Sequence, residues 1–146
     1  MKRIIMISFI LSIGLAIVYI LQERTNAKLS EPVIMNTEHG DFILHLRVEN
    51  TEEGFQVLRS LEYTGSDPVM IEHRTPLIAV SIDHTRHAYT GSPVRRVLEP
   101  GDIYLSEQPL IFTFRDKGKY VLYAQCQFRM NEEEMNIKLE KDLQFE

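Results

Sequence analysis

The residues best suited to chemistry in this chain of 146 residues lie in one polar loop, residues 83–93. Asp83, His84 and His87 are ligand types for zinc or copper, which makes an extracytoplasmic metal carrier one hypothesis. However, Arg86 separates the two histidines, and a structural zinc site needs four ligands. The other interpretation is a solvated loop that contacts a protein partner through Asp83, His84, Arg86, His87 and Tyr89.

The other candidate residues do not fit a copper site, a calcium site or a serine hydrolase. A blue-copper site needs two histidines beside its cysteine, and no histidine follows Cys126. Glu132, Glu133 and Glu134 are consecutive, whereas a calcium loop alternates its ligands. The serines that follow a glycine lack the Gly-x-Ser-x-Gly elbow of serine hydrolases. The sequence therefore predicts a protein that is not an enzyme and carries no cofactor.

The segments around the loop have the alternation and composition of β-strands. Phe42 to Val48 alternates apolar and polar residues, and residues 55–63 do so with Arg59 as the exception on the apolar side. Pro100-Gly101 and Asp116-Lys117-Gly118 are typical turns between strands. Seven to nine short strands with no helical pattern predict an all-β fold, an antiparallel sandwich of two sheets. Met130 to Asn136 is predicted as the tip of the last hairpin.

One turn resembles a feature of immunoglobulin-like domains. The string Asp116-Lys117-Gly118-Lys119-Tyr120 is similar to the Asp-x-Gly-x-Tyr corner, in which the tyrosine hydroxyl bonds to upstream backbone. The resemblance implies that role for Tyr120, with Asp116 and Gly118 in the turn. Leu122 stands where antibody domains place a cysteine, so residues 42–146 resemble the disulfide-free bacterial immunoglobulin-like or fibronectin-type-III-like modules. Such a resemblance concerns fold and not activity.

The N-terminus has the pattern of an export segment. Lys2-Arg3 precede an apolar run over residues 4–21, close to the length of a membrane-spanning helix and longer than most signal-peptide cores. Residues 1–27 are therefore predicted as a membrane anchor, or alternatively as a signal peptide cleaved near Ala27. Residues 28–41 are predicted as a tether, and residues 42–146 as the sandwich.

Charge narrows the choice of partner. The chain has 16 Lys and Arg against 21 Asp and Glu, a net charge of −5, which disfavours nucleic acid because phosphate binding needs basic surface. The sequence predicts a single-pass membrane protein whose C-terminal domain is extracytoplasmic and binds another envelope or membrane protein, as an accessory subunit. A metal carrier and a small secreted protease inhibitor are the alternatives.

Overall fold

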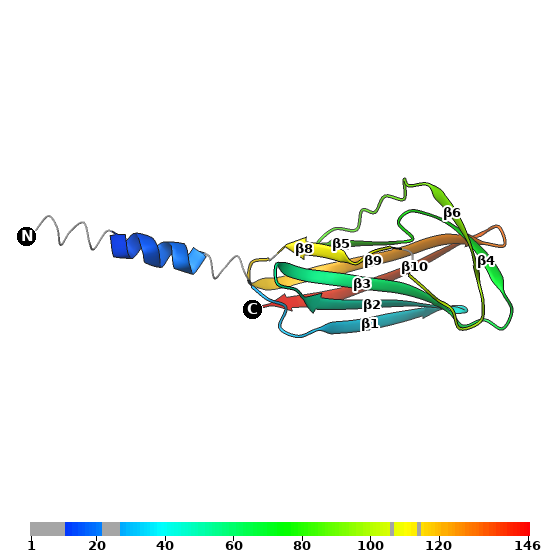
Figure 1. The fold of residues 1–146 in the computed structure, drawn as a ribbon, viewed down its shortest axis with the longest axis horizontal. Helices are drawn as coiled ribbons and strands as arrows, with labels where there is room; N and C mark the ends of the chain where they lie inside the picture. Colours follow the sequence, from blue (N-terminus) through cyan, green and yellow to red (C-terminus); the bar gives the residue numbers. More distant parts are fainter. Residues whose placement is uncertain (1–10, 22–26, 106, 114) are drawn as a thin grey trace, which may run out of the picture.

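The computed structural model describes residues 11–21, 27–105, 107–113 and 115–146 of the chain. These residues form ten strands in two five-stranded antiparallel sheets that lie face to face (Figure 1). The predicted all-β fold with two antiparallel sheets is thereby confirmed. The strands are β1 (Val33–His39), β2 (Phe42–Asn50), β3 (Gly54–Tyr63), β4 (Val69–Arg74), β5 (Ile78–Ile82), β6 (Pro93–Leu98), β7 (Ile103–Tyr104), β8 (Leu110–Thr113), β9 (Gly118–Met130) and β10 (Glu133–Phe145).

Each sheet contains a long strand that pairs, on one side, with two short strands in succession. In the first sheet, β8 pairs with the start of β3 and β7 pairs near its end, while β2 and then β1 lie on the other side. In the second sheet, β5 pairs with residues 122–126 of β9, and β4 pairs with residues 129–130. β10 lies on the other side of β9, and β6 lies outside β4. Gln127 and Phe128 are therefore left between β5 and β4.

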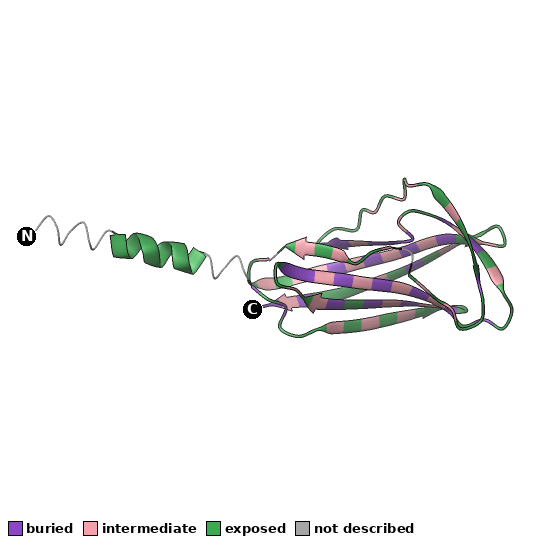
Figure 2. Cartoon of the chain, in the orientation of Figure 1, coloured by how far each residue is buried: buried purple, intermediate pink, exposed green. Residues whose placement is uncertain are grey.

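The core lies between the sheets and follows from the alternation of the strands, which Figure 2 shows as stripes of buried and exposed residues. Phe42 of β2 meets Phe128 of β9 with ring centroids 4.8 Å apart, and Phe55 of β3 meets Phe145 of β10 at 5.1 Å. Cys126 is fully buried among these side chains, and burial raises the pKa of its thiol. Cys126 is therefore a packing residue.

Residues 28–41, predicted as a tether, are instead part of the sandwich. β1 pairs with β2 along its whole length, and Ala27 and Leu29 are buried in the core. The prediction failed because β1 is an edge strand that packs only Val33 and Met35 against the core. An edge strand with polar alternate positions has little apolar alternation to distinguish it from a linker. The sandwich thus includes the described residues from 27 onward.

The last hairpin is tighter than predicted. Only Asn131 and Glu132 connect β9 to β10, and Glu133 and Glu134 already belong to the strand. Both connecting residues have positive φ, 51° and 70°, as a two-residue hairpin turn of type I′ requires. Glu132 therefore occupies a backbone conformation that favours glycine or asparagine.

The N-terminal apolar run is described only in its second half. Residues 11–21 form a helix in which every residue is exposed (Figure 2), while residues 4–10 lie outside the described residues. In the part of the chain that the structure describes, no helix is both long enough and apolar enough to cross a membrane. Residues 22–26, which include most of the predicted cleavage site, also lie outside that part.

Candidate functional site

The loop over residues 83–93 connects β5 to β6, as predicted, and its first residue is tied to the sheet. The Asp83 N–H donates to the Val121 carbonyl at 2.8 Å, and the Val121 N–H donates to Asp83 Oδ1, also at 2.8 Å. Asp83 adopts a φ of 61°, which turns the chain back across β9. The Asp83 carboxylate thus holds the loop at its start.

A chain of polar side chains fastens the middle of the loop. His87 Nε2 lies 2.9 Å from Ser81 Oγ, and His87 Nδ1 lies 3.1 Å from Gln125 Oε1. Gln125 Nε2 donates to Asn136 Oδ1 at 2.8 Å, so the chain extends from β5 across β9 to β10. The buried Ser81 hydroxyl donates to the His84 carbonyl. Because that proton is directed to a carbonyl, the arrangement anchors the loop and does not present an activated serine.

The three residues of the alternative metal-carrier hypothesis do not form a ligand set in the described residues. Among the residues that the structure describes, no group of three histidine, cysteine, aspartate or glutamate side chains could hold a metal ion. Asp83 and His87 are engaged with the sheet, whereas His84 is exposed. The alternation of the loop explains the difference, because His87 and Tyr89 are half-buried against the sheet whereas His84 and Arg86 are exposed.

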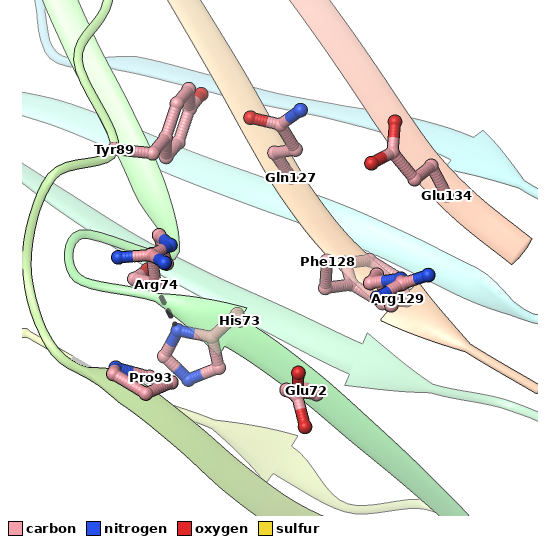
Figure 3. A pocket seen from close by; sticks show the side chains of 9 residues that line it. All are labelled: Glu72, His73, Arg74, Tyr89, Pro93, Gln127, Phe128, Arg129 and Glu134. Atoms are coloured by element: carbon pink, nitrogen blue, oxygen red, sulfur yellow. Dashed lines mark hydrogen bonds between the residues drawn. The ribbon is translucent and has the colours of Figure 1, made fainter. Parts of the chain in front are cut away.

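Tyr89 lies at the rim of a mixed-charge pocket in the fork between β4 and β5. Its hydroxyl donates to the Gln125 carbonyl at 2.7 Å, and burial raises the pKa of the phenol. The buried His73 lies in the pocket, and its Nδ1 forms a hydrogen bond of 2.9 Å with the Arg74 carbonyl (Figure 3). Its Nε2 forms a hydrogen bond of 3.0 Å with the Tyr104 hydroxyl. The pocket has a volume of about 350 Å³. It is lined by Glu72, His73, Arg74, Tyr89, Pro93, Gln127, Phe128, Arg129 and Glu134.

A second hollow opens on the other side of the loop, between β5 and β8, and is called here the Arg59 cleft. Its volume is also about 350 Å³, and it receives His84, Arg86 and His87 from the loop. The remaining lining comes from Arg59 of β3, Arg115, Pro76, Ser81, Ala88 and the apolar side chains of β5 and β8. Arg59 and Arg115 were not among the residues expected to form a site. Arg59 could have been singled out from the sequence, because it is a charged residue on the apolar side of β3.

Arg59 is a charged residue inside the sandwich. Its side chain is only 4% exposed, and its Nε lies 3.5 Å from Oε2 of Glu107. Glu107 also accepts, through Oε1, the backbone N–H of Leu77. Burial lowers the pKa of the Arg59 guanidinium, and the Glu107 carboxylate opposes that shift. Glu107 lies in the connection between β7 and β8, where no sequence pattern marked it.

The turn that resembles an immunoglobulin-like corner makes the expected backbone contact. The Tyr120 hydroxyl donates to the Asp116 carbonyl at 3.0 Å, and Gly118 adopts a φ of 148°. The Tyr120 ring meets Phe145 edge-on at 5.5 Å, and the Arg115 guanidinium lies over the ring at 5.5 Å from its centroid. These contacts fix the end of the sandwich next to the Arg59 cleft.

The loop also borders a third, smaller hollow of about 230 Å³ over β9 and β10, which Thr85 and His87 help to line. One anchored loop therefore meets three hollows of the surface. No protein-family model matches the chain, and no curated protein sequence is similar to it.

Proposed function

We propose that this protein is an exported, membrane-tethered immunoglobulin-like module that binds another protein and performs no catalysis itself. In this role it acts as an accessory subunit of an envelope complex. The observation that supports the proposal is the position of the loop over residues 83–93. It is the longest connection between strands in the sandwich as described, and it borders three hollows.

The loop has the organisation of a binding surface. His87 and Tyr89 are bonded to β5 and β9, while His84, Thr85 and Arg86 are exposed and border the neighbouring hollows. A loop held in one conformation by its own contacts loses less conformational entropy on binding. Its outward residues are thus available to a partner at low ordering cost.

The strands beside the loop provide a second means of contact. Among the described residues, β5 pairs only with β9, and β8 pairs only with β3, so each has one free edge. A free edge can accept an extended segment of another chain by strand addition. A partner that reaches the loop can therefore also pair with an edge strand.

The immunoglobulin-like assignment and the membrane location rest on different observations. Two antiparallel sheets and the hydrogen bond of the Tyr120 hydroxyl to the Asp116 carbonyl support the immunoglobulin-like assignment. For the second, Lys2-Arg3 and the apolar run over residues 4–21 support an anchor that leaves the N-terminus in the cytoplasm. Leu11 and Leu15, each 66% exposed, are side chains that a bilayer would cover.

The proposal is tested with the full-length chain in its own cells. A photo-crosslinking amino acid at position 86 identifies the protein that lies against the loop, and cell fractionation shows whether the chain is in the membrane or the medium. Binding of that purified protein is then measured with the variant Arg86→Glu. The control is Lys141→Glu, the same charge change on β10 at the opposite edge of the second sheet.

We expect Arg86→Glu to weaken binding by about tenfold or more and Lys141→Glu to leave it unchanged, because charge reversal within a contact surface introduces repulsion. If Arg86→Glu and His84→Glu both bind like the unmodified chain, the loop is not the contact surface. Recovery of residues 28–146 free in the medium would show a cleaved signal peptide instead of an anchor.

A further inference from the structure

The Arg59 cleft concentrates positive charge in a chain that is acidic overall. Three arginines, Arg59, Arg86 and Arg115, line it together with His84 and His87, and none of its described lining residues is an aspartate or glutamate. The whole chain, in contrast, has a net charge of −5. By comparison, the pocket at Tyr89 is lined by two glutamates as well as two arginines. The charge of the Arg59 cleft therefore selects for an anion.

Arg59 gives this cleft a buried donor. Its Nε and Nη1 are buried and make no hydrogen bond to the described residues, and the buried Oε2 of Glu107 likewise makes none. Glu107 stands 3.5 Å from Nε, which is longer than a charge-assisted hydrogen bond. A guanidinium presents its donors in a planar fork that matches the two oxygens of a carboxylate. Glu107 shows that a carboxylate can approach this guanidinium inside the sandwich.

The walls of the cleft are apolar and well supported. Ile78, Val80 and Ile82 of β5 lie on one side, with Leu110 and Phe112 of β8 on the other. The ring of Phe112 stacks on that of Phe55, with the centroids 4.9 Å apart and the planes within 7° of parallel. A volume of about 350 Å³ is within the range of small-molecule sites and accommodates a side chain or a small organic group.

We infer that the Arg59 cleft binds a carboxylate that is joined to an apolar group. The carboxylate pairs with the arginines, and the apolar group packs between β5 and β8. A free C-terminus of a partner polypeptide that ends in an apolar residue has this chemistry, and so does a free organic acid. The inference rests on the proposed function, because the exposed Arg86 belongs both to the cleft and to the loop surface.

The test uses the full-length chain in neutral maltoside micelles and two soluble probes. One is acetyl-Gly-Gly-Phe with a free carboxylate, and the other is 3-phenylpropanoate; the matched controls are the corresponding amides. Binding is followed by NMR at the Nε–H resonances of the arginines. We expect saturable binding of at least one acid, with the amide weaker by about tenfold or more, because the amide loses the charge-assisted hydrogen bonds.

Two variants locate the site. The double variant Arg59→Met with Glu107→Gln removes both buried charges together, and we expect it to weaken acid binding by about tenfold or more. Arg115→Gln changes a half-buried residue of the lining and should also weaken acid binding. It replaces the double variant as the test if that variant does not fold. Arg95→Gln is the control, because Arg95 lies on β6 and pairs with Glu72, away from the cleft.

The outcomes separate the inference from the proposed function. Tighter binding of the peptide acid indicates a partner C-terminus as the source, and tighter binding of 3-phenylpropanoate indicates a free acid. Equal binding of acids and amides, no saturable binding of either acid, or full binding by the folded double variant overturns the inference. If the crosslinked partner does not bind Arg86→Glu and neither acid shows saturable binding, the proposed function holds and the carboxylate site is wrong.

Discussion

The two long sides of the sandwich are closed in different ways. On one side, the residues before β1 pair with the end of β10. Lys28 and Glu146 exchange two backbone hydrogen bonds of 3.0 and 2.9 Å, and the buried Leu29 packs beneath them. On the other side, β5 and β8 form no ladder with each other, and the Arg59 cleft opens between them.

The difference identifies which side is available for binding. The closed side joins backbone groups directly at Lys28 and Glu146, and the Asn50 amide pairs with the backbone of Leu29. The open side keeps a guanidinium within the sandwich, and burial of a charge is unfavourable unless the charge is paired. A sandwich that needed only stability would place an apolar residue at position 59. The polar loop crosses this same side, which agrees with a surface shaped for a ligand.

The largest effect is expected at the open side. Glu107→Gln keeps a side-chain acceptor for the Leu77 N–H but leaves Arg59 as a buried charge without its counterion. We expect a loss of about 3 kcal/mol in the free energy of unfolding, measured by urea denaturation. The double variant with Arg59→Met should recover most of this loss.

Added 3-phenylpropanoate should stabilise Glu107→Gln more than the unmodified chain, since it supplies the missing carboxylate. A loss below about 1 kcal/mol would show that the pair is effectively solvated.

On the closed side, loss of the Asn50 side-chain amide should lower the stability of the fold. Asn50 Oδ1 accepts the Leu29 N–H, and Asn50 Nδ2 donates to the Leu29 carbonyl, both at 2.9 Å. Asn50→Ala should lower the free energy of unfolding by about 2 kcal/mol, because two backbone groups lose their partner. Asn36→Ala, at an exposed position of β1, is the control. Carboxylate binding should not change, and a parallel loss of binding would mean that the two sides are coupled.

A smaller effect is expected at Tyr120, which contacts residues of both sides. Tyr120→Phe removes the hydrogen bond to the Asp116 carbonyl and keeps the ring between Phe145 and Arg115. We expect the free energy of unfolding to fall by about 1 kcal/mol while carboxylate affinity stays the same. Tyr123→Phe is the matched control. Loss of carboxylate affinity in Tyr120→Phe would show that the hydroxyl, and not the ring alone, positions Arg115.

The smallest effect is expected far from either side, at the hairpin tip. Glu132→Gly should raise the free energy of unfolding by about 0.5–1 kcal/mol, because glycine adopts positive φ without the steric penalty of a side chain. Glu133→Gly, inside β10, should lower it instead. Neither change should alter carboxylate binding. If Glu132→Gly is destabilising, the turn is not strained at that residue.

Much of the fold was predictable because it depends on local patterns. The alternation of β2 and the turn residues before β9 each indicated a strand or a turn without reference to distant residues. β1 was missed because an edge strand buries too few side chains to show this alternation. The hairpin tip was placed too broadly, because nothing in three consecutive glutamates indicates which of them continues the ladder.

The sequence by itself determined an all-β chain with two antiparallel sheets, a polar loop at residues 83–93 and a turn before Tyr120, since alternation and turn chemistry act over a few residues. Only the tertiary structure decided what the loop touches. It directed Asp83 and His87 to the sheet instead of to a metal, and it brought Arg59, Glu107 and Arg115 together from three separate segments. These contacts depend on how the two sheets pack against each other. A pattern of neighbouring residues does not predict contacts between residues so far apart in the chain.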